Sequence, residues 1–374
     1  MLKDGSEVMK YNFDELIERR NTGSVKWDKH FETGKSPLPM WVADMDFPCS
    51  HAIQKALHDK VNEQVYGYQL GFDDTYRDAV VHWFLKRFNW KIDPSSLYYV
   101  GGVVPSISYL LEIMCNEGDG VIIQTPVYYP FREKIKATGR CVVENPLQNT
   151  NGIYKMDFKD LEQKLAREDV KGMILCSPHN PVGRVWKIEE LSEVVRLAKQ
   201  YGKWIISDEI HCDLIHHTSV HTPIMKVAQG YEDGIVVCTA PSKSFNLAGL
   251  HISNIVIVNK LWQAAWKRYV QQRLTINGPN CFATCATIAA YKSEDSEQWL
   301  AAVNAYVDAN DAYLRSYIKE YLPQVVISPR EGTYLLWLDV RTLCSDEKLL
   351  EQHMLQEGLV VDEGYLFGEE GKRG

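Results

Sequence analysis

The sequence predicts an α/β fold, in which a large domain built on a mostly parallel sheet is joined to a smaller α+β domain. Short apolar runs alternate with longer helical patterns up to about residue 275, which is typical of a parallel sheet with helices on both faces. After residue 275, a long helical stretch is followed by two short alternating segments. The length of 374 residues also exceeds what one hydrophobic core usually serves, so two domains are expected.

Seven apolar runs are the expected strands of the large domain. They cover residues 97–100, 121–124, 141–144, 172–176, 204–207, 235–239 and 252–258. Amphipathic stretches separate several of them; residues 189–201, for example, place Leu191 and Val194 on one apolar helix face. Because ligands of such sheets bind beyond the carboxyl ends of the strands, the residues directly after each run are the first candidates for a functional site.

Residues 51–275 are expected to form the large domain and residues 276–374 the smaller one. In the smaller domain, helical periodicity covers roughly residues 280–320. Residues 324–328 and 333–338 then alternate like antiparallel strands before a further helix. Residues 1–50 contain the turn-rich stretch SPLPMWVADMDFP and are expected to cross over and join the smaller domain.

Charge and composition argue against several classes of function. The formal net charge is −8 and no long basic run is present, so binding to nucleic acid or to an anionic membrane is not expected. The first 20 residues are charged throughout and no apolar stretch approaches about 18 residues, so neither a signal peptide nor a membrane span is predicted. Nine cysteines lie without Cys-x-x-Cys or Cys/His spacing, which favours reduced thiols in the cytoplasm over disulfides or a bound metal.

Five of the runs end in segments that carry chemistry. The first run leads into GGVVPS, where Gly102 and Val103 open a helix whose free N–H groups suit a phosphate. This signal is weak alone, since paired glycines often only turn the chain. The other four segments are TPVYYPF with Tyr128, SPHNPVGRVW with Asn180, SDEIHCDL with Asp208 and APSKSFNLAGL with Lys243.

Together these segments supply the groups that a pyridine aldehyde cofactor needs. Such a cofactor requires a lysine amine for its Schiff base, a carboxylate at the ring nitrogen, a donor to the ring hydroxyl, a stacking aromatic ring and an anion-binding turn. These roles fall, in that order, to Lys243, Asp208, Asn180, Tyr128 and the turn at Gly102. A single lysine after a strand is usually a solvated surface group, and a single Asn-Pro is usually a turn. The coincidence of five roles at five strand ends predicts pyridoxal 5'-phosphate (PLP) as the cofactor.

The same segments resemble a known family. SPHNPVGRVW, SDEIHCDL and APSKSFNLAGL are similar to the three signature blocks of class I/II PLP-dependent enzymes, which have the aspartate-aminotransferase fold. The opening YNFDELIERRNTGSVKWD, the segment PLPMWVADMDF and the helix start VVPSISYLL resemble the MalY/PatB group of cystathionine β-lyases, also called C–S lyases. The resemblance runs from about residue 11 to the end and implies a PLP-binding large domain of that fold.

The resemblance implies a role for each of these side chains. Lys243 would form the Schiff base and, once released by the substrate amine, take the Cα proton. Asp208 would pair with the pyridinium nitrogen, Asn180 would bond the ring hydroxyl, and Tyr128 would stack on the ring. His211 stands where aminotransferases have a tyrosine that also bonds the ring hydroxyl, so a cofactor contact and a structural role are both open for it.

In this family, the cofactor phosphate is held by an anion-binding turn, a hydroxyl group and a tyrosine of a second subunit. The resemblance assigns the turn to Gly102 and Val103 and the hydroxyl to Ser242. The tyrosine is assigned to Tyr68, with Tyr66 as the competing choice. A homodimer with shared active sites is therefore expected, with a small sulfur-containing amino acid as the substrate.

Two departures from the family pattern concern anion binding. Aminotransferases commonly carry an arginine eight residues after the lysine, where this chain has His251, so phosphate binding is expected to rely on backbone amides, the hydroxyl and the partner chain. The family binds the substrate carboxylate through an arginine in a C-terminal F-x-R-x-N-x-G-C-P-R motif, whereas this sequence ends at GEEGKRG. Arg373 precedes the expected position and is expected to be a surface charge. Two explanations are open: either this chain is truncated or its substrate binding is impaired. If the arginine is absent, a folded, PLP-loaded protein with a strongly raised KM and a lowered kcat is expected.

The resemblance implies α,β-elimination from an amino acid with sulfur on Cβ, such as cystathionine or cysteine, to give a thiol, pyruvate and ammonia. Transamination is the first alternative, because it uses the same cofactor contacts and differs only in the fate of the substrate carbanion. A PLP-bound regulatory protein that acts through a partner is the second, although intact Lys243, Asp208 and Asn180 argue against lost chemistry. A nucleotide-binding α/β fold is disfavoured, because GGVVPS lacks the spaced G-x-G-x-x-G pattern.

Overall fold

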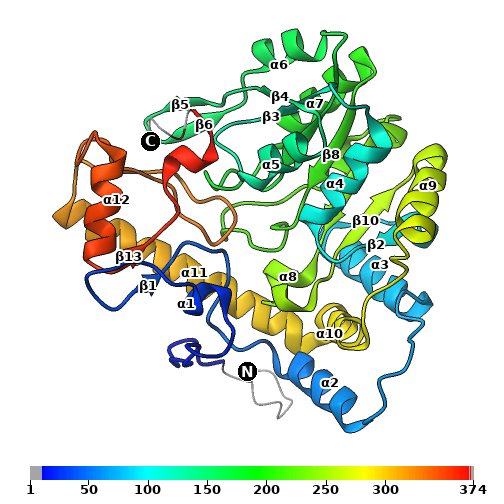
Figure 1. Cartoon of the computed structure of the whole chain (residues 1–374), viewed down its shortest axis with the longest axis horizontal. Coiled ribbons are helices and arrows are strands. Elements are labelled where there is room, and N and C mark those ends of the chain that lie inside the picture. Colours follow the sequence, from blue (N-terminus) through cyan, green and yellow to red (C-terminus); the bar gives the residue numbers. More distant parts are fainter. Residues whose placement is uncertain (1–10, 370, 372–374) are drawn as a thin grey trace, which may run out of the picture.

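The computed structural model describes residues 11–369 and residue 371. Its centre is a seven-stranded sheet of order β2-β10-β9-β8-β7-β3-β4, in which β10 runs antiparallel to the other six strands (Figure 1). The strands are β2 (Leu97–Tyr99), β3 (Gly120–Ile123), β4 (Cys141–Glu144), β7 (Val170–Cys176), β8 (Trp204–Asp208), β9 (Ile235–Thr239) and β10 (Asn254–Ile257). Each of the seven apolar runs contains a strand, and the predicted mostly parallel α/β sheet is confirmed.

The central strands are buried on both sides of the sheet. Every residue of β8 and β9 is buried, which explains why these strands are largely continuous apolar runs in the sequence. Along β9, Ile235 and Val237 pack into one core cluster, whereas Val236 and Cys238 pack into the other. This alternation is the period of two that a strand with two covered faces requires.

The strands β7 and β8 approach each other closely at Gly172. Gly172 lies opposite Trp204 in the parallel register of these strands. A Cβ atom on Gly172 would lie 2.1 Å from a carbon of the Trp204 indole ring. The absence of a side chain at residue 172 therefore makes room for the ring, which is itself buried.

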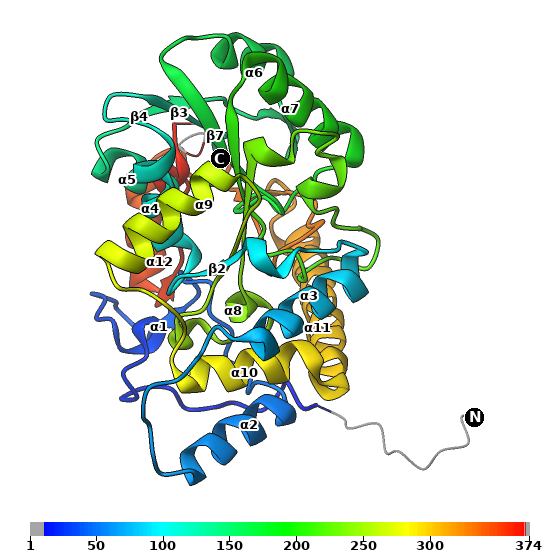
Figure 2. The same ribbon diagram turned by 90° about the vertical axis from the view of Figure 1, so that its right-hand side faces the viewer.

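Two groups of helices cover the two faces of the sheet (Figure 2). One face carries α4 (Val103–Met114), α5 (Pro130–Ala137) and α9 (Lys260–Trp266), which continues as a π-helical segment, Lys267–Arg273. The other face carries α3 (Asp74–Phe88), α6 (Phe158–Leu165) and α7 (Ile188–Tyr201). At the start of α7, the Glu190 carboxylate accepts a hydrogen bond from the Lys187 N–H, and the helix ends at Gly202 with a left-handed backbone.

The predicted helical stretch of residues 280–320 is two helices, α10 (Cys281–Lys292) and α11 (Glu294–Tyr321). They are divided at Ser293, whose backbone is extended with φ −87° and ψ 131°. α10 packs against α3 and α2 (His51–Asn62), whereas α11 extends beneath the sheet towards the C-terminal part of the chain (Figures 1 and 2).

The predicted strand at residues 333–338 is wrong except for its last residue. The pair that forms is β11 (Val326–Ile327) with β12 (Leu338–Asp339), in antiparallel register. The residues before β12 bond instead to the loop after β8, where the Thr333 N–H donates to the Leu214 carbonyl at 2.7 Å and Ile215 bridges to Gly332. Because this loop satisfies their backbone groups, local alternation does not decide their structure.

The N-terminal segment crosses to the C-terminal part of the chain (Figure 1). α1 (Val25–Asp28) leads to β1 (Leu38–Pro39), which pairs in parallel with β13 (Leu359–Val360), next to α12 (Glu347–Gln356). The remaining elements are the hairpin of β5 (Gln148–Thr150) and β6 (Ile153–Lys155), the short helix α8 (Pro241–Ser244), and 3₁₀ turns at Pro94–Ser96, Ile224–Val227, Glu232–Gly234, Ala248–Leu250 and Gly364–Phe367. Among the described helices, none has both the length and the apolar character needed to cross a membrane.

Candidate active site

The candidate residues of the large sheet meet at the carboxyl ends of its parallel strands. Asp208 is the last residue of β8, Lys243 lies on α8 directly after β9, and Asn180 follows β7. Tyr128 follows β3, and its backbone N–H donates to the Asn180 carbonyl at 3.0 Å. Because β7, β8 and β9 are hydrogen-bonded neighbours, the topology alone brings these side chains to one edge of the sheet.

Asp208 is a buried carboxylate that forms no ion pair within the described residues. It accepts a hydrogen bond from the Ile210 N–H at 3.1 Å, and in the described part of the chain no cationic side chain forms an ion pair with it. Burial raises the pKa of the Asp208 carboxyl to about 7, although the Ile210 hydrogen bond and the charge of Lys243 act in the opposite direction. A positively charged partner placed here would hold this carboxylate ionised.

Lys243 has an amine that burial makes easier to deprotonate. Its Nζ donates a hydrogen bond to the Ala43 carbonyl at 2.6 Å. Burial lowers the pKa of the Lys243 ammonium, while the negative charges of Asp44 and Asp208 partly counteract this effect. A larger neutral fraction makes the amine a better nucleophile and a better base.

Asn180 and His211 present polar atoms that the described protein does not satisfy. The Asn180 Oδ1 atom is buried and has no hydrogen-bond partner, and neither has the buried His211 Nδ1 atom. Burial lowers the pKa of His211 to about 3, with Lys243 adding to the effect, so this imidazole is neutral at physiological pH. Its ring also packs edge-on against Tyr334, with ring centroids 6.1 Å apart. Unpaired buried polar atoms at one site favour a bound polar molecule.

The predicted phosphate end lies at the start of α4. Gly102 caps this helix with a φ of 145°, and its own N–H donates to the Val100 carbonyl at 2.8 Å. Its contribution is therefore the conformation that opens the helix, whereas Val103 is the first helical residue and lies in the first turn, whose N–H groups suit an anion. Ser242 lies on α8, next to Lys243. His251 lies beside this turn, because a Cβ atom on Gly101 would be 3.7 Å from the His251 Cβ.

The two candidate tyrosines do not reach this site within one chain. Tyr68 is fully exposed, in the segment between α2 and α3. Tyr66 is half exposed; its hydroxyl donates to the Val61 carbonyl at 2.9 Å, and its ring packs on Phe282. A single copy of the chain therefore leaves the predicted tyrosine contact to the phosphate unmade.

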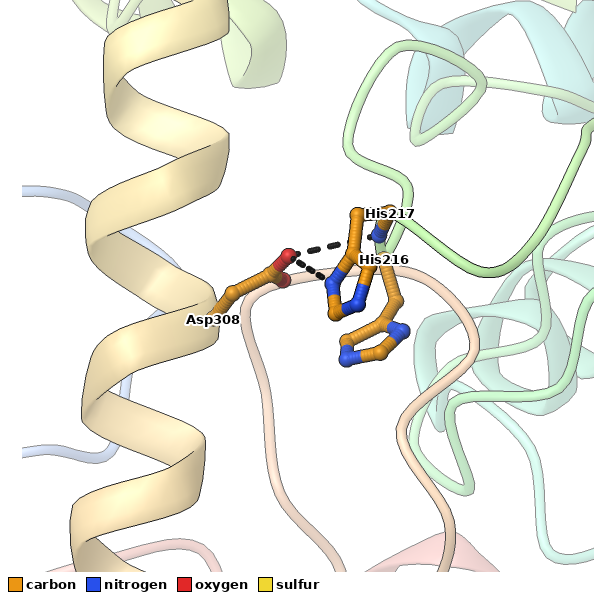
Figure 3. A group of neighbouring side chains, drawn as sticks. All are labelled: His216, His217 and Asp308. Atoms are coloured by element: carbon orange, nitrogen blue, oxygen red, sulfur yellow. Dashed lines mark hydrogen bonds and ion pairs between the residues drawn. The ribbon is translucent and has the colours of Figure 1, made fainter.

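One group of side chains lies close enough to offer ligands to a metal ion. The candidate ligand atoms of His216, His217 and Asp308 lie within 4.8 Å of one another (Figure 3). However, His217 Nδ1 is 2.8 Å from one Asp308 oxygen, and Arg330 forms an ion pair with the other. The Arg330 charge already compensates the Asp308 carboxylate and would repel a bound metal cation. We therefore interpret this group as a structural contact that holds the loop after β8 against α11.

Comparison with known proteins identifies the family. The profile of the family "Aminotransferase class I and II" matches residues 41–373. The chain belongs to the class I and II aminotransferase family. It is 38% identical to cystathionine beta-lyase PatB of Bacillus subtilis over 96% of this chain and 93% of that protein. It is 32% identical to protein MalY of Escherichia coli over 97% of this chain and 92% of that protein.

The solved structures of this family agree with the fold. The PLP-bound C-S lyase from Staphylococcus hominis is similar with a TM-score of 0.91 and 33% identity, covering 98% of this chain and 93% of that chain. The predicted resemblance to the MalY/PatB group of class I and II aminotransferase-family proteins is confirmed. PLP, the cofactor predicted from the sequence, is the cofactor of this family.

The residues of this family member fit PLP. Asp208 lacks the ion-pair partner that a protonated pyridine ring would supply, and Lys243 offers an amine of lowered pKa to an aldehyde. The unpaired Oδ1 atom of Asn180 is an acceptor for a hydroxyl group. Tyr128 lies at the same edge of the sheet with a largely buried ring, and burial raises the pKa of its hydroxyl above the ordinary range. Asp208, Lys243 and Asn180 thus fit three groups of the cofactor, namely its pyridinium nitrogen, its aldehyde and its ring hydroxyl.

Sequence reasoning missed three residues at this edge. Ala43 accepts a hydrogen bond from Lys243, and Asn246 donates to backbone carbonyls of the same N-terminal segment. Tyr334 packs on His211. Of these three residues, only Asn246 could have been suspected from the sequence, because it follows Lys243 by three residues in the segment APSKSFNLAGL. Arg373 lies outside the described residues.

Proposed function

We propose that this protein is a PLP-dependent C–S β-lyase, which performs α,β-elimination on cystathionine or a cysteine-type substrate. The observation that carries the proposal is the presence of the buried Asp208 carboxylate and the Lys243 amine at one edge of the sheet, in a chain that matches PatB over 96% of its length. PatB and the C-S lyase of Staphylococcus hominis both bear the name of a lyase, which favours elimination over transamination for this chain. No observation specific to this chain favours a purely regulatory role.

The residues divide the work between holding the cofactor and moving protons. When bound, PLP supplies an aldehyde that condenses with amines and a pyridinium ring that accepts the electrons left at the substrate Cα. Asp208 would hold the proton on the ring nitrogen, and this proton would keep the ring electron-poor. Asn180 would bond the ring hydroxyl, and the Tyr128 ring would stack on the cofactor. His211 completes the wall of the site with a neutral imidazole.

Lys243 carries the proton transfer in this proposal. Its neutral Nζ takes the proton from the substrate Cα, and the electron pair left behind expels the thiolate as the Cβ–S bond breaks. The proton on Lys243 then passes to the departing sulfur, so the thiol leaves neutral and the amine returns to its free form. Addition of water to the remaining three-carbon fragment yields pyruvate and ammonia. The balance is one substrate and one water in, and one thiol, one pyruvate and one ammonia out.

We also propose that the protein works as a homodimer in which Tyr68 reaches the cofactor phosphate of the partner subunit, with Tyr66 as the competing residue. The segment between α2 and α3 supports this proposal, because it leaves large apolar side chains uncovered. Val65 is 74% exposed and Leu70 is 88% exposed. A cytoplasmic location and the division into residues 1–50, 51–275 and 276–374 remain predictions alongside it.

The proposed function is tested by separating elimination from transamination in one preparation. The PLP-loaded protein is mixed with L-cystathionine and assayed for pyruvate and free thiol. In parallel, it is mixed with an amino acid and an oxo acid and assayed for amino-group exchange. We expect stoichiometric pyruvate and thiol, with exchange at least about 100-fold slower. Faster exchange than elimination would assign the protein to transamination instead.

A further inference from the structure

The N-terminal arm, defined as residues 41–47, forms part of the wall around Lys243. The arm is more than 190 residues away in sequence, yet its Ala43 carbonyl accepts the hydrogen bond from Lys243 Nζ at 2.6 Å. Burial lowers the pKa of the Lys243 ammonium, and Asp44 of the same arm acts in the opposite direction. The placement of the arm therefore affects both the position and the charge of this amine.

Asn246 attaches the arm to the loop that carries Lys243. Its side-chain Nδ2 donates to the Met45 carbonyl at 2.9 Å and to the Phe47 carbonyl at 2.8 Å, so both amide protons are used on the arm. Its backbone lies in the left-handed region with φ 58°, which asparagine tolerates better than other non-glycine residues. This conformation, three residues after Lys243, lets one side chain bond the arm on both sides of Asp46.

The outer side of the arm is held by charged side chains. Arg19 forms ion pairs with Asp44 at 2.8 Å and with Asp46 at 2.7 Å. Lys26 pairs with Asp46 at 2.6 Å and donates to the Asp44 carbonyl at 2.8 Å. The Met45 carbonyl accepts from Arg19 as well as from Asn246. Arg19, Lys26 and Asn246 therefore hold the arm together, and its Ala43 carbonyl accepts the hydrogen bond from Lys243.

We propose that Asn246 is a positioning residue for the catalytic base, which seats the arm so that the Ala43 carbonyl holds the free amine of Lys243. A carbonyl that accepts one N–H of a neutral amine fixes the direction of the nitrogen lone pair, and this lone pair is what takes up the Cα proton. The kinetic part of this inference rests on the proposed function, because it treats Lys243 as the base. The structural part, the dependence of the arm on Asn246, does not.

Two substitutions test the inference on the PLP-loaded protein. Asn246→Gly accepts the positive φ and removes both hydrogen bonds, and Asn246→Asp keeps an asparagine-like backbone preference but removes both donors. Asn89→Gly is the matched control, because Asn89 has φ 49° at the end of α3, far from the arm in the sequence. Thermal melts of all three variants establish that each is folded.

The first readout is amide hydrogen exchange in peptides covering residues 41–47, without substrate. We expect exchange at least about tenfold faster in both Asn246 variants and unchanged in Asn89→Gly. Unchanged exchange in a folded Asn246 variant would overturn the proposal. This readout is independent of the reaction, so it remains valid even if the wild type releases no pyruvate.

The second readout is the pH dependence of kcat for elimination. Loosening the arm admits water to Lys243, which moves the pKa of its ammonium back towards the ordinary value. The acidic limb of the kcat profile is therefore expected to move to higher pH in both Asn246 variants, with kcat reduced about tenfold and KM changed less. The proposal would also be overturned if the arm exchanged faster while kcat and the acidic limb of its pH profile stayed unchanged. Asn246 would then hold the arm in place without affecting the catalytic base.

Discussion

Replacing Asp208 with asparagine is predicted to stabilise the cofactor-free protein while it abolishes the activity of the loaded one. Burial raises the pKa of this carboxyl from 3.8 to about 7 in the folded chain. Because one pKa unit corresponds to about 1.4 kcal/mol, keeping the ionised carboxylate buried costs the folded protein about 4 kcal/mol above pH 7. This cost belongs to the protein without its cofactor, where no described side chain forms an ion pair with the carboxylate and the charge of Lys243 offsets its burial only in part.

The pH dependence follows from the direction of the shift. The folded form binds the proton more tightly than the unfolded form, so the destabilisation is absent below about pH 4 and grows as the pH rises. It reaches its full value above about pH 7 and stays constant there. Asparagine keeps an acceptor for the Ile210 N–H but buries new donors, which costs about 1–2 kcal/mol. The net stabilisation by Asp208→Asn is therefore about 2–3 kcal/mol at pH 8 and close to zero at about pH 5.

The assay is urea unfolding of the cofactor-free wild type and variant at these two pH values. Asp74→Asn serves as the control, because its side chain is 98% exposed and its charge can be removed at little cost. In the loaded protein, loss of the carboxylate is expected to lower kcat by at least about 100-fold. A cofactor-free Asp208→Asn protein that is no more stable than the wild type at pH 8 would refute the reasoning about an uncompensated buried charge.

Two further predictions concern packing and the partner subunit. Gly172→Ala places a Cβ atom 2.1 Å from the Trp204 ring and is expected to destabilise the protein by at least about 3 kcal/mol, measured by urea unfolding. Gly249→Ala, which meets no atom within 4 Å, is the control for an added methyl group; an equal cost at both positions would contradict the packing argument. Tyr68→Phe is expected to raise the Kd for PLP about tenfold in fluorescence titrations, with the dimer intact by light scattering. An effect of Tyr66→Phe in its place would assign the contact to Tyr66.

The sheet could be predicted from the sequence because its strands are buried on both faces. Such strands are short apolar runs between helical patterns, and all seven runs proved to contain strands. The antiparallel direction of β10 could not be predicted, because an apolar run indicates a buried strand but not the direction of that strand in the sheet. The division of the helical stretch at Ser293 and the displaced strand before Leu338 depend on backbone conformation and on contacts with the loop after β8, which periodicity does not encode.

The candidate site was predictable to the extent that its residues follow strands. The strand-end rule for parallel sheets finds four site residues without a structure, because each lies within four residues of the end of an apolar run: Lys243, Asp208, Asn180 and Tyr128. The contact of Lys243 with the Ala43 carbonyl could not be predicted, because it involves a backbone group 200 residues away that no side-chain pattern indicates. Tyr68 is exposed in the single chain, so its proposed contact with the phosphate of a partner subunit stays a prediction.

The measurement that tests the central claim most directly is the visible absorption spectrum of the PLP-loaded protein, before and after L-cystathionine, with pyruvate assayed in parallel. Lys243→Ala is compared with the wild type and with Lys55→Ala, which removes an exposed lysine. The account predicts a cofactor band and pyruvate release in the wild type and in Lys55→Ala, and neither the same band nor pyruvate in Lys243→Ala. A wild-type protein that shows no band after addition of PLP, or an unchanged band in Lys243→Ala, would contradict the assignment of Lys243 and of the cofactor site.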